Sequence, residues 1–198
     1  MTHSIFASPS EDTFVARVLS TQGRLRDLAM RAALGMALAS IAGLAMGARE
    51  GLLAMAVHAV GVPCALLAVA LLGLPSLYVV LSLFDTPLDS RALLAAAASA
   101  LSATGLVLAG LAPTIMLFGV TSAGPEGAAI TSSVGLAMGC LIGLLQMRFM
   151  IANSITQMSM ARRAIAAGVL AVFGLFAIAL ATRLAYALLP VLVGGHVV

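Results

Sequence analysis

The residues that could carry metal or redox chemistry in this chain are its two cysteines, Cys64 and Cys140. A zinc or redox site brings thiol or imidazole groups together at close spacing, as in CxxC. These two cysteines are far apart in the sequence, and both lie in apolar segments. We therefore expect two small buried hydrophobic side chains, and we expect no metal or cofactor.

Motifs of catalysis are absent from the sequence as well. There is no HExxH, no GxSxG and no Walker A loop, and these are patterns that place a zinc ion, a nucleophile or a phosphate. No Asp or Glu falls clearly inside an apolar segment, so a buried carboxylate for proton coupling is not indicated. We expect a protein that is not an enzyme.

Three charged residues are candidates for a structural ion pair. Arg183 lies near the end of the last apolar segment, and Glu50 and Glu126 lie in turns that we place on the same side of a membrane. A charge at membrane depth is costly unless it is paired. We predict that Arg183 pairs with Glu50 or with Glu126.

Three prolines interrupt the apolar segments, and Pro63, Pro75 and Pro113 are candidate helix breaks. A proline removes one backbone N–H and frees a carbonyl group, and Ser76 and Thr114 follow two of them with a hydroxyl. Broken helices at corresponding positions can form a transport site. A kink that helps the helices pack is the preferred interpretation.

Two patterns of spaced glycines are candidates for helix packing. The first is Gly43 with Gly47, and the second is Gly135 with Gly139 and Gly143. Small residues at this spacing let two helix backbones approach closely in lipid. We expect these glycines to make contacts within the chain, and an interface between copies of the chain is the alternative.

The composition decides in which solvent these residues lie. Hydrophobic residues make up 62% of the chain and charged residues 9%, whereas about a quarter of a soluble domain is charged. The mean hydropathy is +1.16. The basic residues are scattered, so no nucleic-acid surface is indicated. The predicted fold class is therefore all-α, an integral membrane bundle in a lipid bilayer.

Apolar runs of about 20 residues predict five transmembrane helices. An amphipathic helix is expected within the cytoplasmic segment 1–27, and the transmembrane domain then fills 28–198. A short surface helix is the preferred interpretation of 51–61, and whether 184–195 spans the membrane or lies on its surface stays open. The predicted spans are 28–47, 63–84, 90–111, 128–147 and 164–189.

The arginines predict the orientation of these spans. Positive charge concentrates in cytoplasmic segments, and this bias is strongest with the N-terminus inside and the C-terminus outside. The outer segments then hold only Arg49 and Arg183. The cytoplasmic segments hold Arg17, Arg24, Arg26, Arg31, Arg91, Arg148, Arg162 and Arg163.

Two span-end motifs resemble those of a family of small bacterial multi-pass membrane proteins. One is the Pro-x-Leu-Tyr step at 75–78, and the other is the Ala-Pro step at 112–113 with Phe118 close behind. Pro63 is similar to a proline that opens the second span in that family. The chain departs from the family in having His58 where a basic residue is expected. The resemblance implies the inner membrane of a bacterium, and it implies no activity.

Two functions fit this sequence. The first is a non-enzymatic subunit or scaffold of a membrane complex, with other membrane protein subunits or further copies of the chain as partners. The alternative is a transporter or channel component with Pro-broken helices. Transport predicts a polar cavity at mid-membrane near Pro75, Ser76 and Pro113. A scaffold predicts a dry bundle with an exposed face of small residues.

Overall fold

The protein is a bundle of five long α-helices. The computed structural model describes residues 10–83, 90–122, 124–154 and 160–192. Each helix contains a stretch that is long and apolar enough to cross a membrane, so the predicted all-α membrane bundle is confirmed. The helices are α1 (Ser10–Met46), α2 (Leu52–Leu83), α3 (Ser90–Thr121), α4 (Pro125–Ser154) and α5 (Met160–Leu192).

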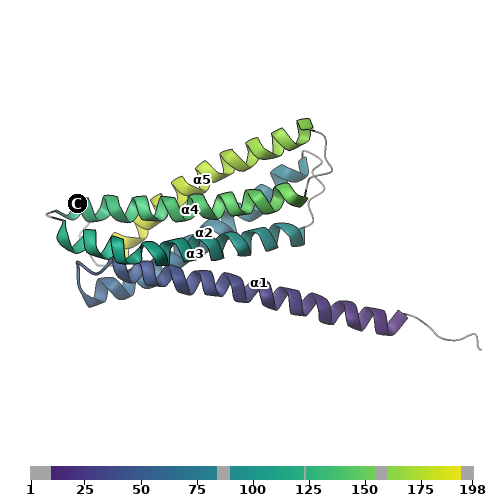
Figure 1. Ribbon diagram of the computed structural model, residues 1–198, viewed down its shortest axis with the longest axis horizontal. Coiled ribbons are helices and arrows are strands. Elements are labelled where there is room, and N and C mark those ends of the chain that lie inside the picture. The colour runs from purple at the N-terminus through teal and green to yellow at the C-terminus, as the bar shows by residue number, and fades with distance from the viewer. Residues whose placement is uncertain (1–9, 84–89, 123, 155–159, 193–198) are drawn as a thin grey trace, which may run out of the picture.

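The helices alternate in direction, so α1 begins and α5 ends at opposite ends of the bundle (Figure 1). Their contacts close into a ring. α3 packs extensively against α1 and α4, α1 also packs against α2, and α5 bridges α4 and α2. α2 and α3 touch only weakly across the ring. The ring therefore runs from α1 through α3, α4, α5 and α2 back to α1, and α1 joins α2 to α3.

α1 is one uninterrupted helix, whereas the sequence predicts a separate amphipathic helix within 1–27 and a span from 28. The described part of both segments belongs to a single helix of 37 residues, which measures about 55 Å at 1.5 Å per residue. No proline falls between Ser10 and Met46 to end it. Its first turns extend past the other helices (Figure 1), and the stretch Leu25–Met46 is apolar enough to cross a membrane.

α2 also continues where the sequence predicts a boundary. The expectation of a separate surface helix at 51–61 is wrong, because α2 runs from Leu52 to Leu83 and includes Pro63 and Pro75. α3 likewise includes Pro113 and continues to Thr121. Backbone groups opened at a proline find no water inside a bilayer, so the chain keeps its helical hydrogen bonds on either side of each proline.

A tight turn joins α1 to α2 and sets them side by side. Gly51 has a φ of 103°, which is the left-handed region that favours glycine because it lacks a Cβ. The Glu50 amide donates to the Gly47 carbonyl oxygen at 3.1 Å, and the Met55 amide donates to the Gly51 carbonyl oxygen at 3.0 Å. The first bond lies within the turn, and the second joins the turn to the first turn of α2.

The buried side chains form two core clusters, one toward each end of the bundle. The turn-side cluster lies near the α1–α2 turn and is rich in alanine; the far cluster lies among α2 to α5. The turn-side cluster is Ala39, Ala42, Ala45, Val62, Leu66, Leu108, Ala112, Ile115 and Leu136. The far cluster is Leu77, Leu81, Leu93, Ala96, Met147, Ile151, Ala166 and Leu170.

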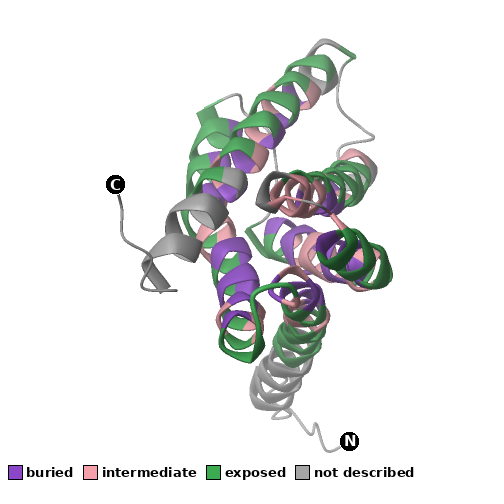
Figure 2. Ribbon diagram, turned by 90° about the vertical axis from the view of Figure 1, so that its left-hand side faces the viewer, coloured by how far each residue is buried: buried purple, intermediate pink, exposed green. Residues whose placement is uncertain are grey.

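The outer surface of the bundle is apolar over most of its length. Exposed residues cover the outward faces of the helices in Figure 2, and many of them are large and hydrophobic. Leu71 on α2 is 68% exposed, Leu117 on α3 is 63% exposed and Leu175 on α5 is 72% exposed. In water so much apolar surface would drive aggregation, and in a bilayer it is the surface that lipid chains cover.

The backbones of α1 and α3 approach each other closely at Gly35 and Gly105. A Cβ added to Gly35 would lie 2.5 Å from the Leu101 carbonyl oxygen, and one added to Gly105 would collide with the Gly35 carbonyl oxygen. The two backbones therefore touch at a pair of facing glycines. Such contacts bring a Cα–H group against a carbonyl oxygen and add a weak attraction.

Gly105→Ala should force α1 away from α3. We expect a loss of about 1 to 3 kcal/mol of unfolding free energy, which is the usual cost of overpacking, seen as a lower thermal midpoint by circular dichroism in detergent. Gly110→Ala is the matched control, because Gly110 lies on α3 with nothing within 4 Å of an added Cβ. Alanine is the better helix former, so the control should not lower the midpoint. Equal midpoints for the two variants would contradict the contact.

Candidate functional site

The first pair of predicted packing glycines lies at the contact of α1 with α2. A Cβ added to Gly43 would collide with the carbonyl oxygen of His58, and one added to Gly47 would lie 2.6 Å from the Ala54 carbonyl carbon. Both glycines are buried. The GxxxG pattern thus brings two consecutive helices of the same chain together rather than facing lipid.

The second set of predicted glycines lies at the contact of α4 with α3. Added Cβ atoms at Gly135 and Gly139 would come within 2.7 Å of Ile115 Cδ1 and 2.8 Å of Leu108 Cγ. At Gly143 the added Cβ would collide with the Thr104 hydroxyl oxygen. The three glycines form a groove along α4 into which side chains of α3 fit.

Two further packing glycines, Gly73 and Gly174, do not belong to the spaced patterns predicted from the sequence. The Phe173 ring of α5 fills the space above Gly73 on α2, with its ring atoms 2.8 Å from an added Cβ. Gly174 on α5 faces Leu144 on α4, with a methyl carbon 3.2 Å from an added Cβ. Every contact in the ring of helices therefore contains at least one glycine that a larger residue would crowd.

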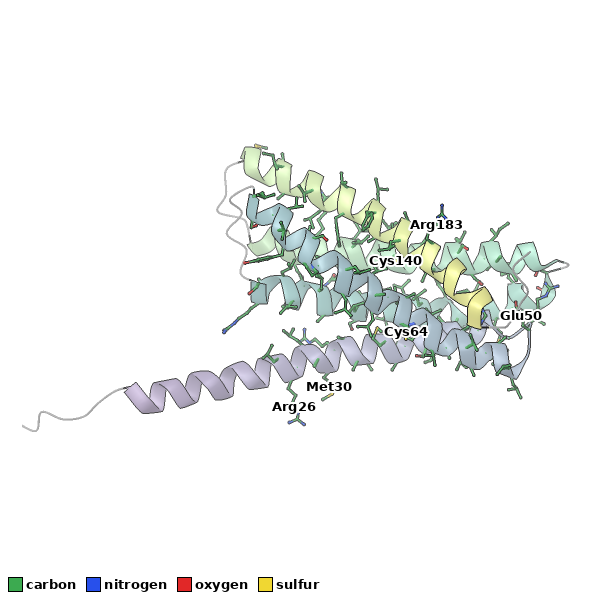
Figure 3. The ribbon with its side chains drawn as sticks, turned by 180° about the vertical axis from the view of Figure 1, so that it is seen from behind. Arg26, Met30, Glu50, Cys64, Cys140 and Arg183 are labelled. Atoms are coloured by element: carbon green, nitrogen blue, oxygen red, sulfur yellow. The ribbon has the colours of Figure 1, made fainter. Side chains whose placement is uncertain are left out.

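The structure does not bring Arg183 and Glu50 together. Both side chains are exposed, and Figure 3 shows Arg183 pointing away from the other helices while Glu50 lies in the turn at the end of the bundle. The side chain of Glu126, the other predicted partner, lies outside the described residues. A pairing of Arg183 with Glu126 therefore stays a prediction.

The polar contact that does join two distant segments uses Arg49. Its Nη1 donates to the Ser122 carbonyl oxygen at 3.0 Å, to the Ser122 hydroxyl oxygen at 3.0 Å and to the Gly124 carbonyl oxygen at 2.8 Å. Ser122 and Gly124 belong to the turn between α3 and α4. A cation beside the C-terminus of a helix also favours the helix dipole, and α3 ends at Thr121.

This link, which we call the Arg49 clamp, was not predicted from the sequence. Arg49 and Glu50 interrupt an apolar run, which indicates a turn but not the segment that the turn contacts. The carbonyl acceptors of Ser122 and Gly124 are backbone groups, and every residue carries one. The signal that could have pointed to the clamp is the position of Arg49 at the same end of the bundle as the C-terminus of α3.

His58 is buried inside α2. Its Nδ1 is 2.8 Å from the Ala54 carbonyl oxygen one turn earlier, and the side chain is 7% exposed. In this geometry the ring nitrogen donates to the backbone of its own helix. Among the described residues, no group of three His, Cys, Asp or Glu side chains could hold a metal ion.

The proline and hydroxyl pairs do not face the interior of the bundle. Pro75, Ser76, Pro113 and Thr114 are all exposed on the outer faces of α2 and α3, and only Pro63 is buried. The Ser76 hydroxyl donates to the Leu72 carbonyl oxygen at 3.1 Å. These residues therefore contact the surrounding solvent rather than lining a pathway through the protein.

A cavity of about 80 Å³ lies in the space surrounded by α2, α3, α4 and α5. Three of the lining residues carry a heteroatom in the side chain. These are the hydroxyl of Thr104, the thiol of Cys140 and the thioether of Met147. The remaining lining residues are aliphatic, aromatic or glycine. They are Leu66, Val69, Ala70, Leu74, Ala97, Ala100, Leu101, Gly143, Leu144, Phe173 and Ala177.

The two cysteines have different surroundings. Cys140 is half-buried and lines the central cavity, in keeping with a small hydrophobic role. Cys64 is exposed on α2, so the expectation that both are buried is wrong for this residue. The reason is that lipid-facing positions in a membrane bundle accept apolar side chains as readily as the core does.

Comparison of the chain with protein-family models, with curated proteins and with solved structures finds no match. The resemblance carried by the motifs at 75–78 and 112–113 therefore stays a prediction. The geometry described above is then the main guide to function.

Loss of the Arg49 clamp should loosen the end of the bundle. We expect Arg49→Gln to lower the unfolding free energy by about 1 kcal/mol, since each exposed hydrogen bond contributes modestly, and to speed hydrogen exchange at the start of α4. Glu50→Gln is the control, because it changes a charge in the same turn without touching these bonds. If both variants exchange at the rate of the parent protein, the clamp has no role in stability.

Proposed function

We propose that this protein is a non-enzymatic subunit or scaffold of a membrane complex. The observation that carries the proposal is the apolar interior of the bundle. The central cavity offers no charged side chain, and the prolines and hydroxyls at 75–76 and 113–114 face outward. A bundle of this kind supports a role in holding other membrane components rather than in moving a polar solute.

The transporter alternative has less support. A pathway for an ion or polar solute needs groups that replace its hydration shell at mid-membrane. Those groups would be expected around Pro75 and Pro113, where unwound helix ends could expose backbone carbonyls. α2 and α3 instead stay helical through both residues.

Among the described apolar stretches of the five helices, Ala164–Ala181 of α5 has the smallest buried share. Within its most apolar stretch 22% of the residues are buried, against 39% in α3. Gly168 on this helix is exposed, and an added Cβ would meet nothing within 4 Å. A second protein could therefore approach α5 more closely than it could approach a face of large side chains.

We also propose that the protein lies in the inner membrane of a bacterium with the start of α1 in the cytoplasm. The start of α1 and the start of α3 lie at one end of the bundle (Figure 1), and Arg26, Arg31 and Arg91 belong to these segments. Arg49 belongs to the opposite end. A surplus of arginine at the α1 start supports this orientation under the positive-inside rule.

A subunit or scaffold should leave the membrane together with a partner. We expect the tagged protein, purified in mild detergent from its native membrane, to retain a second membrane protein in fixed stoichiometry, identified by mass spectrometry. Gly168→Leu on α5 and Gly110→Leu on α3 then test which face binds it. Both positions are open in the structure, so neither variant should disturb the fold.

If the partner binds α5, Gly168→Leu should reduce its recovery at least several-fold while Gly110→Leu leaves it unchanged. The opposite pattern would place the partner on α3. If the parent protein leaves the membrane alone at every detergent concentration, and chemical cross-linking in intact cells also captures nothing, the subunit proposal is wrong.

The orientation can be tested with two exposed positions at opposite ends of the bundle, Glu50 and Arg26 (Figure 3). In a Cys64→Ser background, Glu50→Cys should react with a membrane-impermeant maleimide in intact cells. Arg26→Cys should react only after the cells are permeabilised. The reverse pattern would show that the start of α1 lies outside.

A further inference from the structure

The central cavity separates the two core clusters of the bundle. Leu66 of the turn-side cluster lines it, and so does Met147 of the far cluster. The turn-side and far clusters would otherwise meet here. The weak direct contact between α2 and α3 leaves this space unfilled.

The lining of the cavity is almost free of polar groups. Thr104 is 5% exposed, and its hydroxyl oxygen lies against Gly143, where an added Cβ would collide with it. The hydroxyl oxygen thus lies within the α3–α4 contact. The other polarisable groups are the Cys140 thiol and the Met147 thioether, which are weak hydrogen-bonding groups.

Water is a poor occupant of such a space. A buried water needs two to four polar partners, and apolar cavities of comparable size stay dry and take apolar molecules; an engineered cavity of about 150 Å³ binds benzene or xenon. The cavity here is about 80 Å³ and is partly open to the outside of the bundle. Its chemistry and size suit a short stretch of hydrocarbon chain.

The depth of the cavity within the bundle decides which hydrocarbon can reach it. On α2 the lining residues fall between Leu66 and Leu74, in the middle of a helix that runs from Leu52 to Leu83. On α4 they fall between Cys140 and Met147, well inside that helix. The cavity therefore lies at the depth where a bilayer consists of acyl chains, so a chain that enters between the helices can reach it from the side.

We propose that the central cavity holds part of an acyl chain of a membrane lipid. The chain enters between the helices and fills the space between the two core clusters. Phe173 forms part of the wall, since its ring packs on Gly73 and links α5 to α2. A bound acyl chain would thus contact all four helices that surround the cavity. This proposal is independent of the subunit or scaffold role.

The chain contains no tryptophan, so a single introduced tryptophan gives an unambiguous fluorescence signal. Phe173→Trp places the probe at the cavity wall. Phe176→Trp places it three residues later on the same helix, at a position that is 56% exposed and faces lipid. Both proteins are reconstituted in vesicles of phosphatidylcholine whose acyl chains carry bromine, which quenches tryptophan on contact.

The tryptophan of Phe176→Trp should be quenched in every case. If an acyl chain occupies the cavity, the tryptophan of Phe173→Trp should be quenched at least half as strongly as the tryptophan of Phe176→Trp. Adding Ala177→Leu, which fills the cavity from α5, should then reduce quenching at position 173 several-fold and leave position 176 unchanged. No quenching at position 173, or quenching that the filling substitution does not alter, would overturn the proposal.

A second measurement uses the unaltered protein, in case the larger indole ring disturbs the bundle. Vesicles are prepared with a phosphatidylcholine that carries a photoreactive diazirine at the middle of one acyl chain. After illumination, peptide mass spectrometry should find adducts at Cys140 or Met147 as well as on outward residues such as Leu175. Adducts confined to outward residues would overturn the proposal.

Discussion

The close approach of helix backbones at glycine is the constraint on which the rest of this structure depends. In lipid the hydrophobic effect does not drive helices together, so association relies on dispersion contacts and weak hydrogen bonds. Gly35 and Gly105 let α1 and α3 touch backbone to backbone, and Gly143 admits the Thr104 hydroxyl against α4. The turn-side cluster suits the same close approach, since all three of its α1 residues, Ala39, Ala42 and Ala45, are alanines.

The number and type of the helices could be predicted from the sequence, because apolar length alone determines them. Their ends could not be predicted as well. The rules for helices of soluble proteins predict helix breaks at Pro63, Pro75 and Pro113. Inside a bilayer, however, unsatisfied backbone hydrogen-bonding groups cost more than a kink in the helix. The start of α1 is another case, since the change from a polar to an apolar sequence near residue 28 does not end the helix.

The residues of the candidate site also divide into those that could be predicted from the sequence and those that could not. The sequence could predict the first pair, Gly43 with Gly47, and the three glycines of α4. In each set the glycines are spaced four residues apart along the sequence. Gly35 and Gly105 lie on different helices, with all of α2 between them in the sequence, so only the folded chain shows that they meet. The Arg49 clamp was hidden because its acceptors on Ser122 and Gly124 are mostly backbone carbonyl oxygens. The ion pair was predicted for Arg183, which the structure keeps apart from Glu50 (Figure 3). The described link between distant segments uses Arg49 instead.

The order of contacts around the ring differs from the order in which the helices are synthesised. A chain emerges from the ribosome N-terminus first, yet the main partner of α1 is α3, so Gly35 faces lipid or the insertion machinery until α2 and α3 have both entered the membrane. α5 follows the other four helices in the chain, and it closes the ring against α2 through Phe173 and Gly73. The interior of the bundle is therefore open to the bilayer until α5 has entered the membrane.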